Sequence, residues 1–171
     1  MIVYHGSNVE INDIDLSKCR KYKDFGQGFY VTTLEQQAID MAKRVVRRSS
    51  EGTPTVTTFE FDESKLDELN VKRFEGVSED WALMIINNRN ENMTDISNIL
   101  TNQDNKYDIV YGAVANDDIS TIFALYVSGF LKSYQLAEEL EYRKLNNQYS
   151  FHTDKAIKLL TKVGVKVYDK N

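Results

Sequence analysis

The chain has 171 residues, of which 42% are apolar and 27% are charged, and its formal net charge is -5. These values are typical of a globular protein that can bury a core, and we expect one domain over residues 1–171. The acidic balance argues against broad non-specific binding to nucleic acid, and the lack of a membrane-spanning run or signal-peptide pattern predicts a cytoplasmic protein without a membrane partner.

The first third of the chain predicts strands that flank a helix. Apolar and β-branched runs predict strands over residues 1–5, 28–33 and 55–61. Between the last two, apolar residues at helical spacing predict a helix from residue 34 to about residue 48. Thr32 or Thr33 is expected to cap this helix.

The remainder of the chain predicts short strands that alternate irregularly with helices. Strands are expected over residues 69–74, 107–114, 148–152 and 165–168. Helices are expected over residues 78–88, 119–130, 134–143 and 154–161, with Ser78 capping the first and Asp117 or Asp118 the second. The polar stretch 90–105 predicts a loop, with a short helix over 96–100 left open. Without regular βαβ alternation, the pattern predicts an α+β fold.

Two segments carry the candidate chemistry. His5-Gly6-Ser7 ends the first strand, and the glycine-containing segment 24–33 leads into the second strand with Tyr30. The backbone of Gly6 is open to close approach because no side chain blocks it, and Tyr30 offers an aromatic face. Together they can form a slot for a flat aromatic amide, and His5 can hydrogen-bond a ligand hydroxyl. Taken singly, each residue also fits an ordinary strand end, core aromatic or tight turn.

The order and spacing of these segments resemble the ADP-ribosyltransferase superfamily in its His-Tyr-Glu branch, which includes diphtheria toxin and the poly(ADP-ribose) polymerases. The chain also resembles, over nearly its whole length, an uncharacterised bacterial family that looks ADP-ribosyltransferase-like. That match rests on Tyr4-His5-Gly6-Ser7, segment 24–30, Trp81, Asn88-Arg89, segment 107–112 and segment 148–153. The resemblance implies a split, strongly twisted sheet with NAD in the cleft between its halves. The NAD-binding residues it implies are His5, Gly6, Ser7, Phe25, Gly28, Tyr30 and Ala38.

The third catalytic residue departs from the branch, because Gln148 stands where the Glu would be. An amide can hydrogen-bond a ribose hydroxyl but has no charge to stabilise an oxocarbenium ion. This argues against a polymerase activity that elongates chains of ADP-ribose. His5, Tyr30 and Gln148 are therefore the predicted catalytic set. Glu139 and Glu141 form a competing Glu-x-Glu pair, but they fall in a segment with helical spacing and are read as a solvated helical face.

A second departure is Ala38. It stands where the polymerases have a Ser that hydrogen-bonds the carboxamide of the nicotinamide. Two basic clusters, residues 18–23 and 43–48, fit a solvated surface, or else they flank the slot and meet the pyrophosphate of NAD or an anionic acceptor. No metal is expected, because the two histidines lie far apart in sequence and no cysteine pair accompanies them.

The resemblance implies a mono-ADP-ribosyltransferase that uses NAD as its substrate and modifies a protein or nucleic acid. A toxin or regulator with a neutralising partner protein is one form of this expectation. Two alternatives stay open: a degenerate module that binds NAD or ADP-ribose without transfer, and an NAD glycohydrolase in which water replaces the acceptor.

Overall fold

The structure is a computed structural model that describes residues 1–94, 96, 99–141 and 146–170. Within these residues the strands form two sheets. The first sheet has β3 (Thr55–Phe61) at its centre, between β1 (Ile2–Ser7) and β7 (Leu160–Val167), and both pairings are antiparallel. Its strands form because β-branched and aromatic residues dominate them, as in the Thr-Val-Thr-Thr-Phe run of β3.

The second sheet has the order β2-β6-β5-β4. Its strands are β2 (Phe29–Val31), β6 (Asn147–Phe151), β5 (Ile109–Ala113) and β4 (Val71–Arg73). The pairings of β6 are antiparallel and that of β4 with β5 is parallel. The two sheets meet where Tyr4 and Thr32 exchange backbone hydrogen bonds of 2.8 and 3.0 Å.

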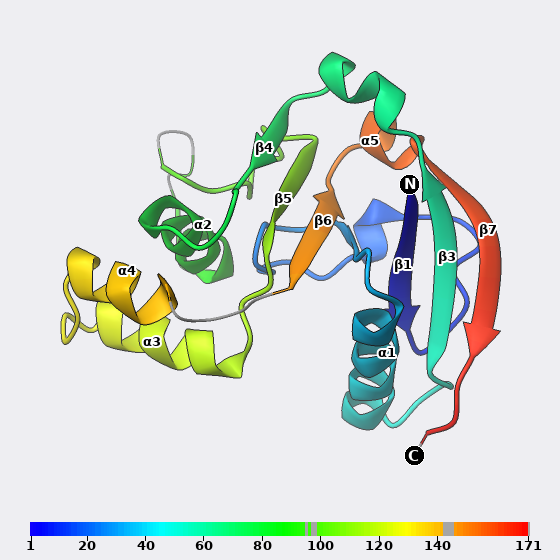
Figure 1. Cartoon of the computed structure of the whole chain (residues 1–171), viewed down its shortest axis with the longest axis horizontal. Coiled ribbons are helices and arrows are strands. Elements are labelled where there is room, and N and C mark those ends of the chain that lie inside the picture. Colours follow the sequence, from blue (N-terminus) through cyan, green and yellow to red (C-terminus); the bar gives the residue numbers. More distant parts are fainter. Residues whose placement is uncertain (95, 97–98, 142–145, 171) are drawn as a thin grey trace.

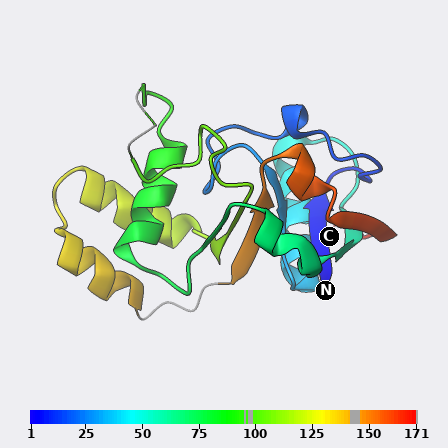
Figure 2. The same ribbon diagram turned by 90° about the horizontal axis from the view of Figure 1, so that it is seen from above.

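The larger helices divide between the two sheets (Figures 1 and 2). Helix α1 (Glu35–Ser49) packs on β1, whereas α2 (Glu79–Arg89), α3 (Asp117–Val127) and α4 (Ser133–Glu141) gather beyond the second sheet, at the opposite end of the molecule. Three shorter helices complete the order: η1 (Leu16–Lys18), η2 (Glu63–Glu68) and α5 (Asp154–Ile157). The α+β class predicted from the sequence is confirmed.

Two buried apolar clusters hold these layers together. One surrounds Trp81, whose indole N–H donates to the carbonyl of Ala113 at 3.0 Å, so that α2 is fixed to β5. The other surrounds Phe59, Phe61 and Phe151, which join the two sheets from opposite sides. The candidate site lies at the junction of the two sheets. Tyr30, which packs against the first cluster, and Phe29, which belongs to the second, both line it.

Most predicted elements are confirmed within a few residues, but the end of the chain is different. The helix predicted over 154–161 ends at Ile157, and the strand predicted over 165–168 begins already at Leu160. Strand β7 pairs with β3 from Phe61 to Thr55, so the open edge of β3 extends the strand beyond what its local sequence indicates.

Two predicted caps are also wrong. Helix α1 begins after Leu34 without a side-chain cap, although the Thr32 hydroxyl accepts from the Leu34 N–H at 3.1 Å. Helix α3 is capped by Asn116, whose side chain accepts from the Ile119 N–H. The Ser78 cap of α2 is confirmed.

Two predictions fall partly on residues that the structure does not describe. The loop predicted over 90–105 has no helix or strand in its described part. The alternative prediction of a short helix over 96–100 includes residues 97–98, which lie outside the described residues. The predicted helix 134–143 likewise runs into residues 142–143. Among the described residues, none of the helices is both long enough and apolar enough to cross a bilayer.

Candidate functional site

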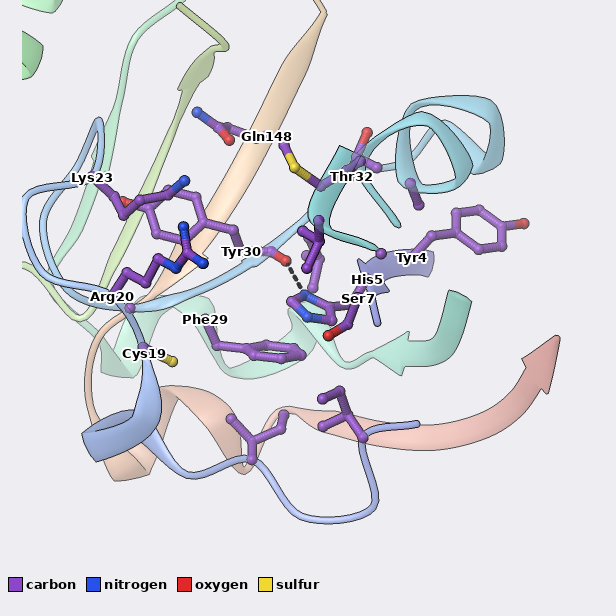
Figure 3. Close-up of a pocket in the computed structure, with 18 of the residues that line it drawn as sticks. Tyr4, His5, Ser7, Cys19, Arg20, Lys23, Phe29, Tyr30, Thr32 and Gln148 are labelled. Atoms are coloured by element: carbon purple, nitrogen blue, oxygen red, sulfur yellow. Dashed lines mark hydrogen bonds between the residues drawn. The ribbon is translucent and has the colours of Figure 1, made fainter. Parts of the chain in front are cut away.

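A cavity of about 400 Å³ opens at the junction of the two sheets. Its wall combines the end of β1, strand β2, one side of α1, the segment 11–23 and one side chain from β6 (Figure 3). The structure brings together here most of the predicted site residues: His5, Gly6, Ser7, Gly28, Tyr30, Ala38 and Gln148. Segments far apart in the sequence thus form one ligand-sized hollow.

His5 is held in one tautomer and one orientation. Its Nδ1–H donates to the Tyr30 carbonyl at 2.7 Å, and its ring stacks on Phe29 with centroids 4.3 Å apart. Burial lowers the pKa of His5, against a smaller raising effect of the Tyr30 carbonyl, so the imidazole is neutral at pH 7. Nε2 is then an acceptor, and no described residue donates to it. The cavity therefore contains a fixed acceptor that a ligand hydroxyl can reach.

Tyr30 presents its ring rather than its hydroxyl. The hydroxyl donates to the Gly26 carbonyl at 2.7 Å and accepts from the Phe25 N–H at 3.0 Å. Burial raises the pKa of the phenol well above its usual value, and the nearby Asp24 raises it further, so the phenol stays protonated. With both hydrogen-bonding functions occupied, the aromatic face is what remains for a ligand.

Phe25 takes no part in the cavity wall, contrary to its predicted role. Its side chain is fully buried, stacks on Phe74 and belongs to the Trp81 cluster. The segment turns there through Gly26, whose φ of 95° suits glycine. Phe25 contributes to the site through its backbone N–H, which positions Tyr30.

The two site glycines satisfy packing demands that the sequence alone did not reveal. A Cβ on Gly6 would lie 1.9 Å from the Ala38 carbonyl oxygen, so α1 rests directly on β1 at this point. A Cβ on Gly28 would lie 2.6 Å from Nδ1 of His152. Gly6 and Ala38 are thus a matched contact between strand and helix, and both residues line the cavity.

His152 anchors the glycine segment to β6. Its Nδ1–H donates to the Gln27 carbonyl at 2.9 Å, and Nε2 accepts from the Ser150 hydroxyl at 2.8 Å. Burial lowers its pKa to about 4, although the Gln27 carbonyl and Asp108 oppose the shift. His152 therefore stays neutral and has a structural role.

Gln148 reaches the cavity through a polar network that sequence reasoning missed. Its Nε2–H donates to Oδ2 of Asp24 at 3.1 Å, and Asp24 forms an ion pair with Arg89 at 2.7 Å. The Ala115 N–H also donates to Oδ2, at 3.3 Å. Asp24 and Arg89 stood in the segments of the family resemblance, but 65 positions separate them, and no local spacing indicated their contact.

Part of the wall is cationic. Both basic clusters contribute to it: Lys18, Arg20 and Lys23 from the segment before β2, and Arg44 and Arg48 from α1. Burial lowers the pKa of Lys23, and the neighbouring charges of Arg20, Arg89 and Arg48 lower it further, against Asp24. Lys18 pairs with Asp15 at 3.2 Å, whereas none of the other four cations forms an ion pair with an acidic side chain in the described part of the chain. An anionic ligand would relieve their mutual repulsion.

The competing Glu-x-Glu pair is described only in part. Glu139 is exposed on α4 and does not line the cavity, and the side chain of Glu141 lies outside what the structure describes. The helix expected from the spacing around them is present. Among the described residues, no group of three or more His, Cys, Asp or Glu side chains is placed to hold a metal ion.

These features define an α+β protein with paired sheets and a cavity at their junction that is lined by both aromatic and cationic side chains. The chain belongs to the family described as "Protein of unknown function (DUF3990)", whose model matches residues 1–161. No curated protein and no solved structure matches it.

Proposed function

We propose that the protein is a mono-ADP-ribosyltransferase that cleaves NAD and transfers ADP-ribose to a macromolecular acceptor. The observation that carries this proposal is the mixed lining of the cavity, which combines aromatic rings with cations. His5, Phe29 and Tyr30 supply the rings, and Arg20, Lys23, Arg44 and Arg48 supply the cations. NAD calls for both, because it has a flat aromatic amide at one end and a diphosphate further along.

In this proposal the nicotinamide ring stacks on Tyr30, and the diphosphate lies near Arg20, Lys23 and Arg48. Stacking on an aromatic face and charge-assisted hydrogen bonds to phosphate are the strong interactions that such a cavity offers. Nε2 of His5 accepts from a ribose hydroxyl, because the Tyr30 carbonyl holds Nδ1 protonated.

The reaction breaks the bond between the ribose and the nicotinamide nitrogen. The bonding pair leaves with nicotinamide, which becomes neutral, and the anomeric carbon develops oxocarbenium character. An acceptor nucleophile then bonds to that carbon and gives up its proton. Gln148 supplies an amide oxygen rather than a charge, so its share is to orient the ribose hydroxyls.

A binding experiment tests the cationic and the aromatic residues of the cavity separately. Arg48→Ala should weaken binding of NAD and ADP-ribose but leave nicotinamide binding unchanged, because only the first two carry the diphosphate. Arg47→Ala is the matched control, since Arg47 is exposed on the same helix and does not line this cavity. Titration calorimetry with the three ligands would show this selectivity. Equal effects of both variants on NAD affinity would refute the proposed placement.

The uncharged Gln148 favours one further candidate, a module that binds NAD or ADP-ribose without transfer. Labelled NAD incubated with the protein and a cell lysate separates the outcomes. Label on a macromolecule supports transfer, free ADP-ribose supports glycohydrolase activity, and bound but unchanged NAD supports the module. NAD that is neither bound nor consumed would refute the proposal.

A further inference from the structure

Asp24 is a nearly buried carboxylate whose oxygens are both occupied. Oδ1 accepts from Nε and Nη2 of Arg89 at 3.1 and 2.7 Å. Oδ2 accepts from the Ala115 N–H at 3.3 Å and from Gln148 Nε2 at 3.1 Å. All of these described partners are donors, so Asp24 acts here as an acceptor. Three segments of the chain converge on it.

An amide side chain beside such a carboxylate has only one favourable orientation. The –NH₂ group must face Asp24, because the carbonyl oxygen would be repelled by the carboxylate. The carbonyl oxygen of Gln148 is thereby directed to the other side. Figure 3 shows the amide nitrogen pointing away from the other labelled residues of the cavity, with the oxygen on their side.

We propose that Asp24 is the positioning residue of the site: it fixes the Gln148 amide with its oxygen toward the ligand, and so requires an amide rather than a carboxylate at position 148. This inference rests on the proposed function for its role in NAD turnover. Gln148 is then the functional residue beside Asp24 and not a replacement that has lost the function of a glutamate. The ribose hydroxyl donates to the amide oxygen, and Arg89 keeps the charge of Asp24 balanced.

A glutamate at position 148 would place a carboxylate oxygen about where Nε2 lies, 3.1 Å from Oδ2 of Asp24. Two carboxylates at such a distance cannot both ionise easily, so the pKa of one of them rises. Gln148→Glu should therefore titrate above the ordinary glutamate range. Asn147→Glu is the matched control, because Asn147 is exposed on the same strand and its side chain bonds Tyr111 rather than Asp24.

The first measurement is the titration of the new carboxyl by carbon NMR in the Gln148→Glu and Asn147→Glu variants. We expect a raised pKa only in Gln148→Glu, and its return toward the ordinary range in the double variant Asp24→Asn/Gln148→Glu. An ordinary pKa in Gln148→Glu would overturn the proposal. This measurement does not depend on any activity, and it reads out the contact even if Asp24→Asn alone fails to fold.

The second measurement is the rate of nicotinamide release. Gln148→Glu should lose about 10²-fold in kcat at neutral pH, the scale of one lost oriented group, and recover as the pH falls. The Asp24→Asn/Gln148→Glu variant should regain at least about 10-fold of this loss, because the Asn amide can donate to the new carboxylate. A double variant no faster than Gln148→Glu would refute the positioning role.

The two measurements separate the two proposals. A wild-type protein that binds NAD but releases no nicotinamide would refute the transferase and leave the titration to decide on Asp24. A wild-type protein that turns over NAD, with a Gln148→Glu variant of ordinary carboxyl pKa and full rate, would refute the positioning role and leave the transferase intact.

Discussion

The pH dependence of stability should reveal the neutral His152 that anchors the glycine segment. Its pKa falls from 6.5 to about 4 because it is buried. The unfolded chain therefore binds a proton between these values that the folded protein does not, so stability falls as the pH decreases from 6.5 to 4. At 1.36 kcal/mol for each pKa unit, His152 should account for about 3 kcal/mol of this loss.

The assay is urea unfolding of the wild type and of His152→Gln at a series of pH values from 7 to about 4. The variant should be less stable at pH 7, because it loses the bonds to Gln27 and Ser150, but its stability should fall less steeply. His5 and the carboxyl groups titrate in both proteins, so the difference between the two curves isolates His152. Parallel curves would refute the assignment of a buried neutral imidazole.

Three further predictions concern the cavity. Tyr30→Ala should weaken NAD binding by about 1 to 3 kcal/mol through lost stacking, whereas Tyr134→Ala, which removes an exposed ring of α4, should not; calorimetry decides. His5→Ala should abolish nicotinamide release while the circular dichroism spectrum stays unchanged, and a variant with full rate would remove His5 from the mechanism. Gly6→Ala should destabilise the protein by about 1 to 3 kcal/mol in thermal unfolding, because its Cβ would meet the backbone of α1 at 1.9 Å, and Gly76→Ala, with open space around it, should be nearly neutral.

The sequence by itself determined the elements whose stability is local. Helix α1 follows from apolar residues that recur along one face, and Ala38, Ala42 and Val46 are its buried positions. Strand β3 follows from its β-branched and aromatic run, and the α+β class follows from the irregular order of such elements. The sequence also singled out His5, Tyr30 and Gln148, which the structure places around one cavity.

Only the tertiary structure decided what each candidate residue faces. Phe25 and Tyr30 stand five positions apart, yet one side chain enters the Trp81 cluster and the other lines the cavity. Gly6 looked like a ligand contact from its sequence, and the structure adds the helix that rests on it. The direction in which a side chain points depends on the segment that packs against it, and that segment comes from a distant part of the chain.

The contacts of Asp24 show that its electrostatic environment, too, was decided by the tertiary structure. Arg89 lies 65 positions away and Gln148 lies 124 positions away, so no periodicity links them. Strand β7 is longer than its own sequence indicates because β3 offers it an edge. Residue type and local spacing determine secondary-structure propensity and the chemistry that a side chain offers. The electrostatic environment of a charged group and the pairing of an edge strand arise only when separate segments come together in the fold.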